Sequence, residues 1–203
     1  MTPCAPFGEP GRRRAHDPSP PGEDFGYGYF DDPAGLGYRG YLRHASGDGA
    51  YLPWAVARDF CETHHVSTAV DVGCAKGFLV EELLGVGIDA VGFDVSSYAL
   101  SFASGLPCYL ADLRDGLRHA AEAVFALGVL LYLDEAELPR VLADLQRHAT
   151  RFLLFSSYYE GEEQDIPDPL RRITRPHEWW RARLTDAGFR FGYRGECFDV
   201  YTT

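Results

Sequence analysis

Two kinds of apolar spacing alternate along most of the chain. From residue 66 onward, short apolar runs typical of buried strands are followed by stretches in which apolar side chains recur every three or four residues, as on one face of a helix. The short runs predict strands over residues 68–72, 90–95, 107–110, 122–127 and 151–155. The longer stretches predict helices over residues 77–84, 97–103 and 134–148, and a last helix that begins at 174–176 and ends at 188.

Strands that alternate with helices are typical of a doubly wound, mostly parallel sheet. The last fifteen residues break this pattern, because their apolar and polar side chains alternate as in a β-hairpin. We therefore expect an α/β fold with an antiparallel last strand. The longest apolar run, residues 123–133, has about half of the roughly 20 residues that a membrane-spanning helix needs, and we interpret it as a buried strand and the turn that follows.

The N-terminal third of the chain does not follow this alternation. Residues 1–24 are rich in proline and carry almost no large apolar side chains, so we expect a disordered leader. Residues 25–65 form a cap, in which a segment rich in aromatic residues and glycine precedes an amphipathic helix over 51–64. Residues 66–203 form the α/β domain.

Composition and charge narrow the class of partner. A chain of 203 residues is long enough for one sizeable core. Its formal charge of −11 leaves no basic surplus for binding nucleic acid or anionic lipid. The five cysteines lack the close spacing of metal ligands, and no targeting segment is recognisable, which favours a reduced, cytoplasmic protein without a metal site.

The most informative stretch is residues 69–80, where a strand runs through a glycine turn into a helix. In a doubly wound fold this turn lies at the carboxyl edge of the sheet, where ligands bind. Gly73 permits the tight turn, and Gly77 lets the helix start close to the strand with free amides. Asp94 ends the next strand, where it can accept hydrogen bonds from two ribose hydroxyls. The pair of features indicates a cofactor that contains adenosine.

The spacing in the loop distinguishes between such cofactors. A dinucleotide site has the pattern G-x-G-x-x-G, whereas here Gly73 and Gly77 are separated by three residues and Asp71 precedes them. An acid at this position repels a pyrophosphate and suits a cation. The chain here resembles the class I S-adenosylmethionine-dependent methyltransferases of small-molecule type, whose first motif reads acid-x-G-x-G-x-G. The resemblance extends over residues 50–203 and includes similar stretches at 108–112, 126–134 and 179–189.

The resemblance implies a Rossmann-like sheet of seven strands, S-adenosylmethionine as the cofactor, and a set of binding residues. Asp71 would orient the methionine amino group, Asp94 would hold the ribose, and Asp112 would accept from the adenine amine. The remaining residues would line the methionine moiety, flank adenine or lie near the sulfonium: Gly73, Cys74, Ala75, Gly77, Phe78, Val95, Leu113, Leu127 and Gly128.

Two positions depart from the family pattern. Ala75 stands where glycine is common, and its methyl group is expected to narrow the loop. The pair Leu131-Tyr132 stands where many relatives carry an acid and a histidine, so a histidine base at that place is excluded. Tyr132 is then a candidate donor to the substrate, with packing in the core as the alternative.

Other candidates for the acceptor side lie outside these motifs. His177, at the start of the late helix, is the first candidate for a general base, and His44 is the second. Tyr38 and Tyr41 would form a lid that contacts the cofactor and excludes water, or would pack in the core. The acidic loop over 160–165 faces either the acceptor or solvent. Lys76 occupies a variable position of the motif, so we expect no role for it in cofactor binding.

These features favour a methyltransferase that acts on a small molecule, with oxygen preferred over nitrogen as acceptor atom. Arginine in place of lysine is typical of a GC-rich genome, which suggests a substrate from specialised metabolism, such as antibiotic biosynthesis. We expect a monomer or a homodimer. Two alternatives remain: a protein that binds S-adenosylmethionine without methylating, as another kind of enzyme or as a non-catalytic partner, and a nucleotide-dependent oxidoreductase, which the loop spacing and Asp71 oppose.

Overall fold

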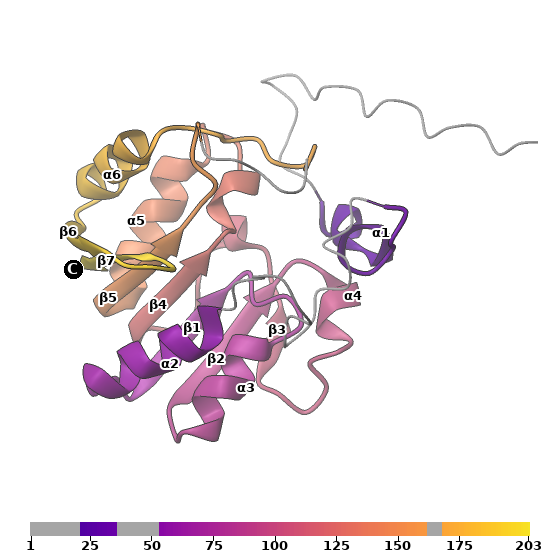
Figure 1. Cartoon of the computed structure of the whole chain (residues 1–203), viewed down its shortest axis with the longest axis horizontal. Helices are drawn as coiled ribbons and strands as arrows, with labels where there is room; N and C mark the ends of the chain where they lie inside the picture. The colour runs from indigo at the N-terminus through magenta and orange to yellow at the C-terminus, as the bar shows by residue number, and fades with distance from the viewer. Residues whose placement is uncertain (1–20, 36–52, 162–167) are drawn as a thin grey trace, which may run out of the picture.

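The computed structural model describes residues 21–35, 53–161 and 168–203. Most of the predicted leader, the Tyr38, Tyr41 and His44 candidates and most of the acidic loop lie outside these ranges. Within them the chain forms a seven-stranded sheet in the order β3-β2-β1-β4-β5-β7-β6 (Figure 1). The first five strands run parallel, and β7 is antiparallel to both of its neighbours. The expected Rossmann-like sheet with an antiparallel last strand is therefore confirmed.

The strand positions follow the apolar runs closely. The strands are β1 Thr68–Val72, β2 Asp89–Asp94, β3 Cys108–Leu110, β4 Ala121–Leu127, β5 Ala149–Ser156, β6 Arg190–Arg194 and β7 Asp199–Thr202. The central strands β1 and β4 are buried on both faces, which explains why they have continuous apolar runs and no alternation. Their carboxyl ends meet at one edge of the sheet, and that edge carries the loops described below.

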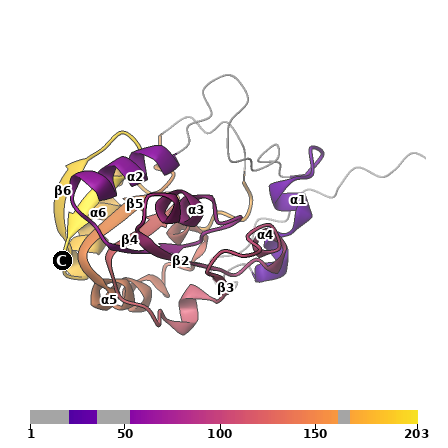
Figure 2. The same cartoon turned by 90° about the horizontal axis from the view of Figure 1, so that it is seen from below.

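Helices cover both faces of the sheet (Figure 2). The longer helices are α2 Pro53–Thr63, α3 Phe78–Gly85, α5 Leu138–His148 and α6 His177–Asp186. The apolar sides of α2 and α3 share one core with the sheet, and those of α5 and α6 share the other. Shorter helical turns are η1 Gly22–Phe25, α1 Tyr27–Phe30, α4 Ser97–Leu100, η2 Leu113–Asp115 and η3 Leu130–Tyr132. None of the helices in the described ranges is long and apolar enough to cross a membrane.

Helix boundaries differ from the prediction by up to four residues, as α5 and α4 show. The helix expected from residue 134 begins at Leu138, because the carboxylate of Asp134 accepts from the Ala136 N–H at 3.2 Å and thereby forms a turn before the helix. Pro139 then lies in the first turn, where its missing N–H costs nothing. The helix expected over 97–103 ends at Leu100 and continues as turns. Both predictions were wrong at one end for local reasons.

The N-terminal residues 21–35, which we call the cap segment, lie against the loops at the carboxyl edge of the sheet. Their side chains Phe25, Tyr29 and Phe30 form a small aromatic core with Ala75 and Ala99. The backbone of the cap segment is also fixed to the domain, because the Ser96 hydroxyl donates to the Phe25 carbonyl at 2.6 Å. An aromatic N-terminal cluster was expected from the sequence, and this part of it is present.

A buried ion pair joins the cap segment to the glycine loop. Lys76, which is only 5% exposed, donates to both carboxylate oxygens of Asp31 at 2.6 and 2.8 Å, and the Tyr98 hydroxyl donates to the same carboxylate at 2.7 Å. Burial raises the pKa of Asp31, but the contacts with Lys76 and Tyr98 outweigh it and hold that pKa below its ordinary value. Lys76 thus connects two segments of the fold.

Replacement of Lys76 by methionine should loosen the cap segment. The variant keeps the length of the side chain but leaves Asp31 without its cation, at a cost of about 2 kcal/mol. Amide hydrogen exchange of residues 28–32 should become about 30-fold faster, which is that free energy expressed as a rate ratio. Arg147→Met is the control, because Arg147 pairs with Asp144 at 2.5 Å but is 67% exposed. Equal exchange in Lys76→Met and wild type would contradict this role.

Candidate functional site

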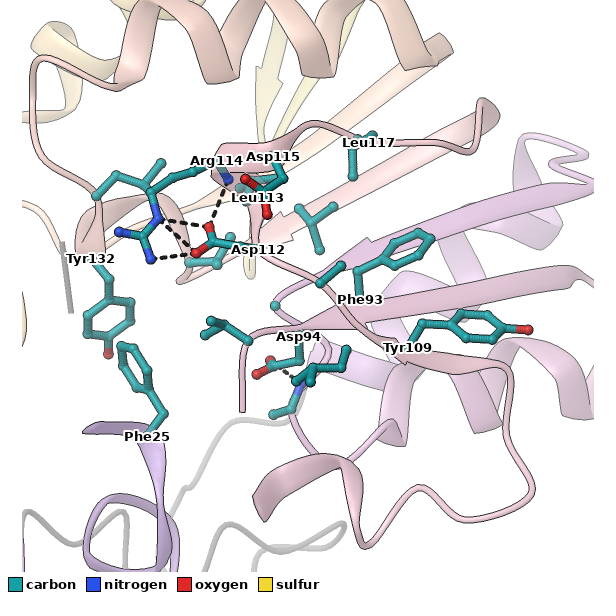
Figure 3. A pocket seen from close by; sticks show the side chains of 18 of the residues that line it. Phe25, Phe93, Asp94, Tyr109, Asp112, Leu113, Arg114, Asp115, Leu117 and Tyr132 are labelled. Carbon is teal, nitrogen blue, oxygen red and sulfur yellow. Dashed lines mark hydrogen bonds and ion pairs between the residues drawn. The ribbon is translucent and has the colours of Figure 1, made fainter. Parts of the chain in front are cut away.

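A cavity of about 660 Å³ opens at the carboxyl edge of the sheet, between the loops after β1, β2, β3 and β4 (Figure 3). Its size is that of a pocket for a cofactor or small molecule. The cap segment forms one wall through Phe25, Tyr29 and Phe30. The predicted site residues that line it are Gly73, Ala75, Asp94, Val95, Asp112, Leu113, Leu127, Gly128 and Tyr132.

The loop after β1 is folded back onto β2. The N–H groups of Gly73 and Cys74 donate to the Phe93 carbonyl at 2.8 and 3.1 Å. Gly73 has φ 78°, and a Cβ there would lie 2.6 Å from the side chain of Val129, so only glycine fits. Ala75 has φ 48°, which is the left-handed region that favours glycine. This explains why glycine is expected at position 75.

Asp94 ends β2 at the centre of the cavity wall (Figure 3). Its carboxylate accepts from the Ala75 N–H at 2.8 Å and from the Ser96 N–H at 2.7 Å, so its position is fixed. Burial raises the pKa of Asp94, and the backbone hydrogen bonds offset part of that effect. A carboxylate has about four acceptor positions, so two hydrogen bonds from backbone leave capacity for hydroxyls of a ligand.

Asp71 lies one strand away and is 6% exposed. Burial, and secondarily the charge of Asp94, raise the pKa of Asp71 to about 8. Asp71 is not among the residues that line the cavity. Two acids this close to one another in a buried place favour a cation nearby, because a positive charge would stabilise both in the ionised form.

Asp112 lines the cavity but is engaged by its neighbour Arg114. The Arg114 guanidinium donates from Nε to both carboxylate oxygens at 2.8 and 2.9 Å, and the Arg114 backbone N–H donates at 2.9 Å. Burial raises the pKa of Asp112, but Arg114 outweighs it and the net effect is a lowered pKa. Contact with an adenine amine would have to share this carboxylate with Arg114, so the predicted role stays a prediction.

Several predicted site residues are not brought to the cavity. Gly77 and Phe78 form the start of α3, and the side chain of Cys74 packs in the core beside Cys108, which contacts it. His177 lies next to β7, where its Nε2 is 2.6 Å from the carboxylate of Asp199, the residue that pairs with Phe155 near the end of β5. This geometry offers no support for His177 as a base, because it is not among the residues that line the cavity.

The cavity also contains residues that the sequence analysis did not select. Phe93 and Tyr109 lie at one end, and Phe25 lies with Tyr132 at the other (Figure 3). Tyr29 also lines the cavity, and its ring contacts that of Tyr132. The Tyr132 hydroxyl is 2.5 Å from that of Tyr29 and donates to Asp168 at 2.7 Å. Tyr29 belonged to the noted aromatic segment, whereas no pattern in the sequence marked Asp168.

Among the residues that the structure describes, no group of three or more His, Cys, Asp or Glu side chains could hold a metal ion.

The fold of this chain is similar to that of several solved structures. No family model and no curated protein matches the sequence. DesVI of Streptomyces venezuelae is 16% identical with a TM-score of 0.59, over 73% of this chain and 88% of that one. The sugar N-methyltransferase KedS8 of a Streptoalloteichus species is 17% identical with a TM-score of 0.60, over 79% and 96%.

A third similar structure is the magnesium protoporphyrin IX methyltransferase of Synechocystis with bound S-adenosylhomocysteine. It is 18% identical with a TM-score of 0.58, over 77% of this chain and 88% of that one. At such identities the likeness concerns the fold. The order of the seven strands and these neighbours together show that the chain has the fold of the class I S-adenosylmethionine-dependent methyltransferases.

Proposed function

We propose that the protein transfers a methyl group from S-adenosylmethionine to a small molecule. The observation that carries this proposal is Asp94, a fixed carboxylate in the wall of a cavity of about 660 Å³ next to the loop of Gly73. Similar structures include methyltransferases of a sugar and of a magnesium porphyrin. When bound, the cofactor supplies an electrophilic methyl group on a sulfonium.

The lining residues fit the parts of that cofactor. Asp94 would accept from the ribose hydroxyls, and Val95 and Leu113 would flank adenine. Asp71, whose pKa is raised to about 8, would become ionised opposite the positive charge of the methionine part. The loop of Leu127 and Gly128 follows β4, which pairs with β1, so this loop lies beside the Gly73 loop and would lie near the sulfonium.

The acceptor would enter at the end of the cavity formed by Tyr132 and the cap segment. Phe25 meets Tyr132 edge to face at 5.1 Å between ring centres, and such aromatic walls exclude water from the transfer. In-line displacement from a sulfonium needs mainly positioning of the two reactants. The hydroxyls and the carboxylate at this end favour a hydroxyl acceptor over an amine. A substrate from specialised metabolism, a cytoplasmic location and a monomeric or homodimeric state complete the proposal.

Calorimetry tests the proposal directly. S-adenosylhomocysteine should bind to the wild type, whereas NAD should not. The Asp94→Asn variant should bind S-adenosylhomocysteine about 10- to 100-fold more weakly, because it loses charge-assisted hydrogen bonds to the ribose. Asp89→Asn is the matched control at the exposed start of the same strand and should bind normally. Absence of heat with S-adenosylhomocysteine would overturn the proposed function.

The raised pKa of Asp71 predicts a dependence of binding on pH. Below about pH 8 the unliganded carboxyl of Asp71 carries a proton, and the ammonium group in the amino-acid part of the ligand binds more tightly once that proton has left. The affinity for S-adenosylhomocysteine should therefore increase as pH rises from about 6 to about 7.5, by up to about tenfold per unit.

Asp71→Asn is the comparison for this measurement, since an amide has the shape of a protonated carboxyl and does not titrate. Titrations at several pH values should give a much flatter profile for this variant. A profile as steep in Asp71→Asn as in the wild type would show that another group titrates.

A further inference from the structure

Three side chains from distant parts of the chain meet at the acceptor end of the cavity. Tyr29 comes from the cap segment, Tyr132 from η3 after β4, and Asp168 from the loop before α6. The two hydroxyl oxygens are 2.5 Å apart, and the Tyr132 hydroxyl donates to Oδ2 of Asp168 at 2.7 Å. Both tyrosines line the cavity, whereas the side chain of Asp168 is fully buried.

The contacts determine which group donates and which accepts in each hydrogen bond of this cluster. An ionised carboxylate can only accept, so the proton of Tyr132 points to Asp168. Since a phenol carries one proton, the proton between the two tyrosines belongs to Tyr29. The oxygen of Tyr132 therefore accepts from Tyr29 and donates to Asp168. When the oxygen of Tyr132 takes up a proton, its own hydroxyl proton can pass to the carboxylate of Asp168.

Asp168 is the last acceptor in this series of hydrogen bonds, and its side chain is held in place by two neighbours. Its Oδ1 accepts from the Leu170 N–H at 2.9 Å, and the Arg171 guanidinium lies 3.6 Å from Oδ2. The side chain of Arg171 is 3% exposed and stacks over the ring of Tyr158 at 3.6 Å. The buried carboxylate thus has a buried cation beside it, which balances its charge.

Anchoring of the cap segment does not account for the cluster. The cap segment is already fixed to the domain by Lys76 with Asp31, by Tyr98 with the same carboxylate, and by Ser96 with the Phe25 carbonyl. The Tyr132 contact is different, because it lies at the cavity wall and ends at a carboxylate that belongs to neither the cap segment nor the glycine loop.

We propose that Tyr132 and Asp168 form a two-step proton relay for a hydroxyl acceptor, with Tyr29 as a positioning residue. This inference rests on the proposed methyl transfer. The acceptor oxygen forms a bond to the methyl carbon while the bond from that carbon to sulfur breaks and its electrons remain on sulfur. The acceptor proton moves to the oxygen of Tyr132, and the Tyr132 proton moves to Asp168.

The charges balance in this step. A sulfonium and a carboxylate are replaced by a neutral thioether and a neutral carboxylic acid, and the acceptor is neutral before and after. The hydrogen bond from Tyr29 stabilises the partial negative charge that forms on the oxygen of Tyr132. A histidine base is not needed, which fits the place of His177 outside the cavity lining.

The test uses two ligands and needs no knowledge of the acceptor. Sinefungin carries a protonated amine where the cofactor carries its methylsulfonium, whereas S-adenosylhomocysteine has no charge there. If the relay faces the transferred methyl group, sinefungin should bind the wild type more tightly than S-adenosylhomocysteine. In Tyr132→Phe and in Asp168→Asn this preference should fall about tenfold, with the affinity for S-adenosylhomocysteine within threefold of wild type.

Tyr98→Phe is the matched control. It removes a phenol oxygen that anchors the cap segment through Asp31, but it leaves the relay intact, so the preference should stay as in wild type. Tyr132→Phe keeps the packing of the ring and carries the test if Asp168→Asn does not fold.

The outcomes separate the two levels of the proposal. An unchanged preference for sinefungin in Tyr132→Phe, or an equal fall in Tyr98→Phe, would overturn the relay and leave the proposed function intact. Failure of the wild type to bind S-adenosylhomocysteine would overturn the proposed function itself.

Discussion

The carboxylate of Asp94 is the interaction on which the edge of the sheet depends. It accepts from Ala75 in the glycine loop and from Ser96 at the start of α4, and so it joins the loops that follow β1 and β2. Ser96 in turn accepts from the Ala99 N–H and donates to the Phe25 carbonyl. The buried carboxylate of Asp94 therefore fixes the glycine loop directly. Through Ser96 it also fixes the start of α4 and the position of the cap segment. An apolar residue here would leave the backbone donors of Ala75 and Ser96 buried without an acceptor, at about 1–3 kcal/mol each.

The glycine loop is under two constraints that act together. Ala75 holds φ 48°, at a cost of about 1–2 kcal/mol for a residue with a Cβ, and its N–H is fixed by Asp94. The next residue, Lys76, is the only lysine of the chain and is held by Asp31. Hydrogen bonds on both sides keep the strained residue in place, and its methyl group packs with Phe25 and Phe30. The methyl group that departs from the family pattern thereby becomes part of the packing between the loop and the cap segment.

Local patterns predicted the parts of the fold that local sequence determines. Residues 68–72 form β1 as predicted, because a strand buried on both faces has a continuous apolar run. Gly73 and Asp94 were found for the same reason, since a turn residue and a strand end are both visible in the sequence. Asp168 could not be found, because it reaches Tyr132 only through the tertiary fold, across 36 residues of chain. His177 was predicted from its residue type and its place at the start of the late helix, and the sequence could not show its contact with Asp199.

The position of the cap segment links binding to chemistry. Tyr29 reaches Tyr132 only when the cap segment lies on the domain, and the cap segment is held there by Lys76 from the same loop that lines the cofactor cavity. Phe25 and Tyr29 also form part of the wall of the cavity, so the position of the cap segment determines the shape of the cavity at that end. The glycine loop and the cap segment are thus joined by a buried ion pair between two residues that are 45 positions apart in the sequence.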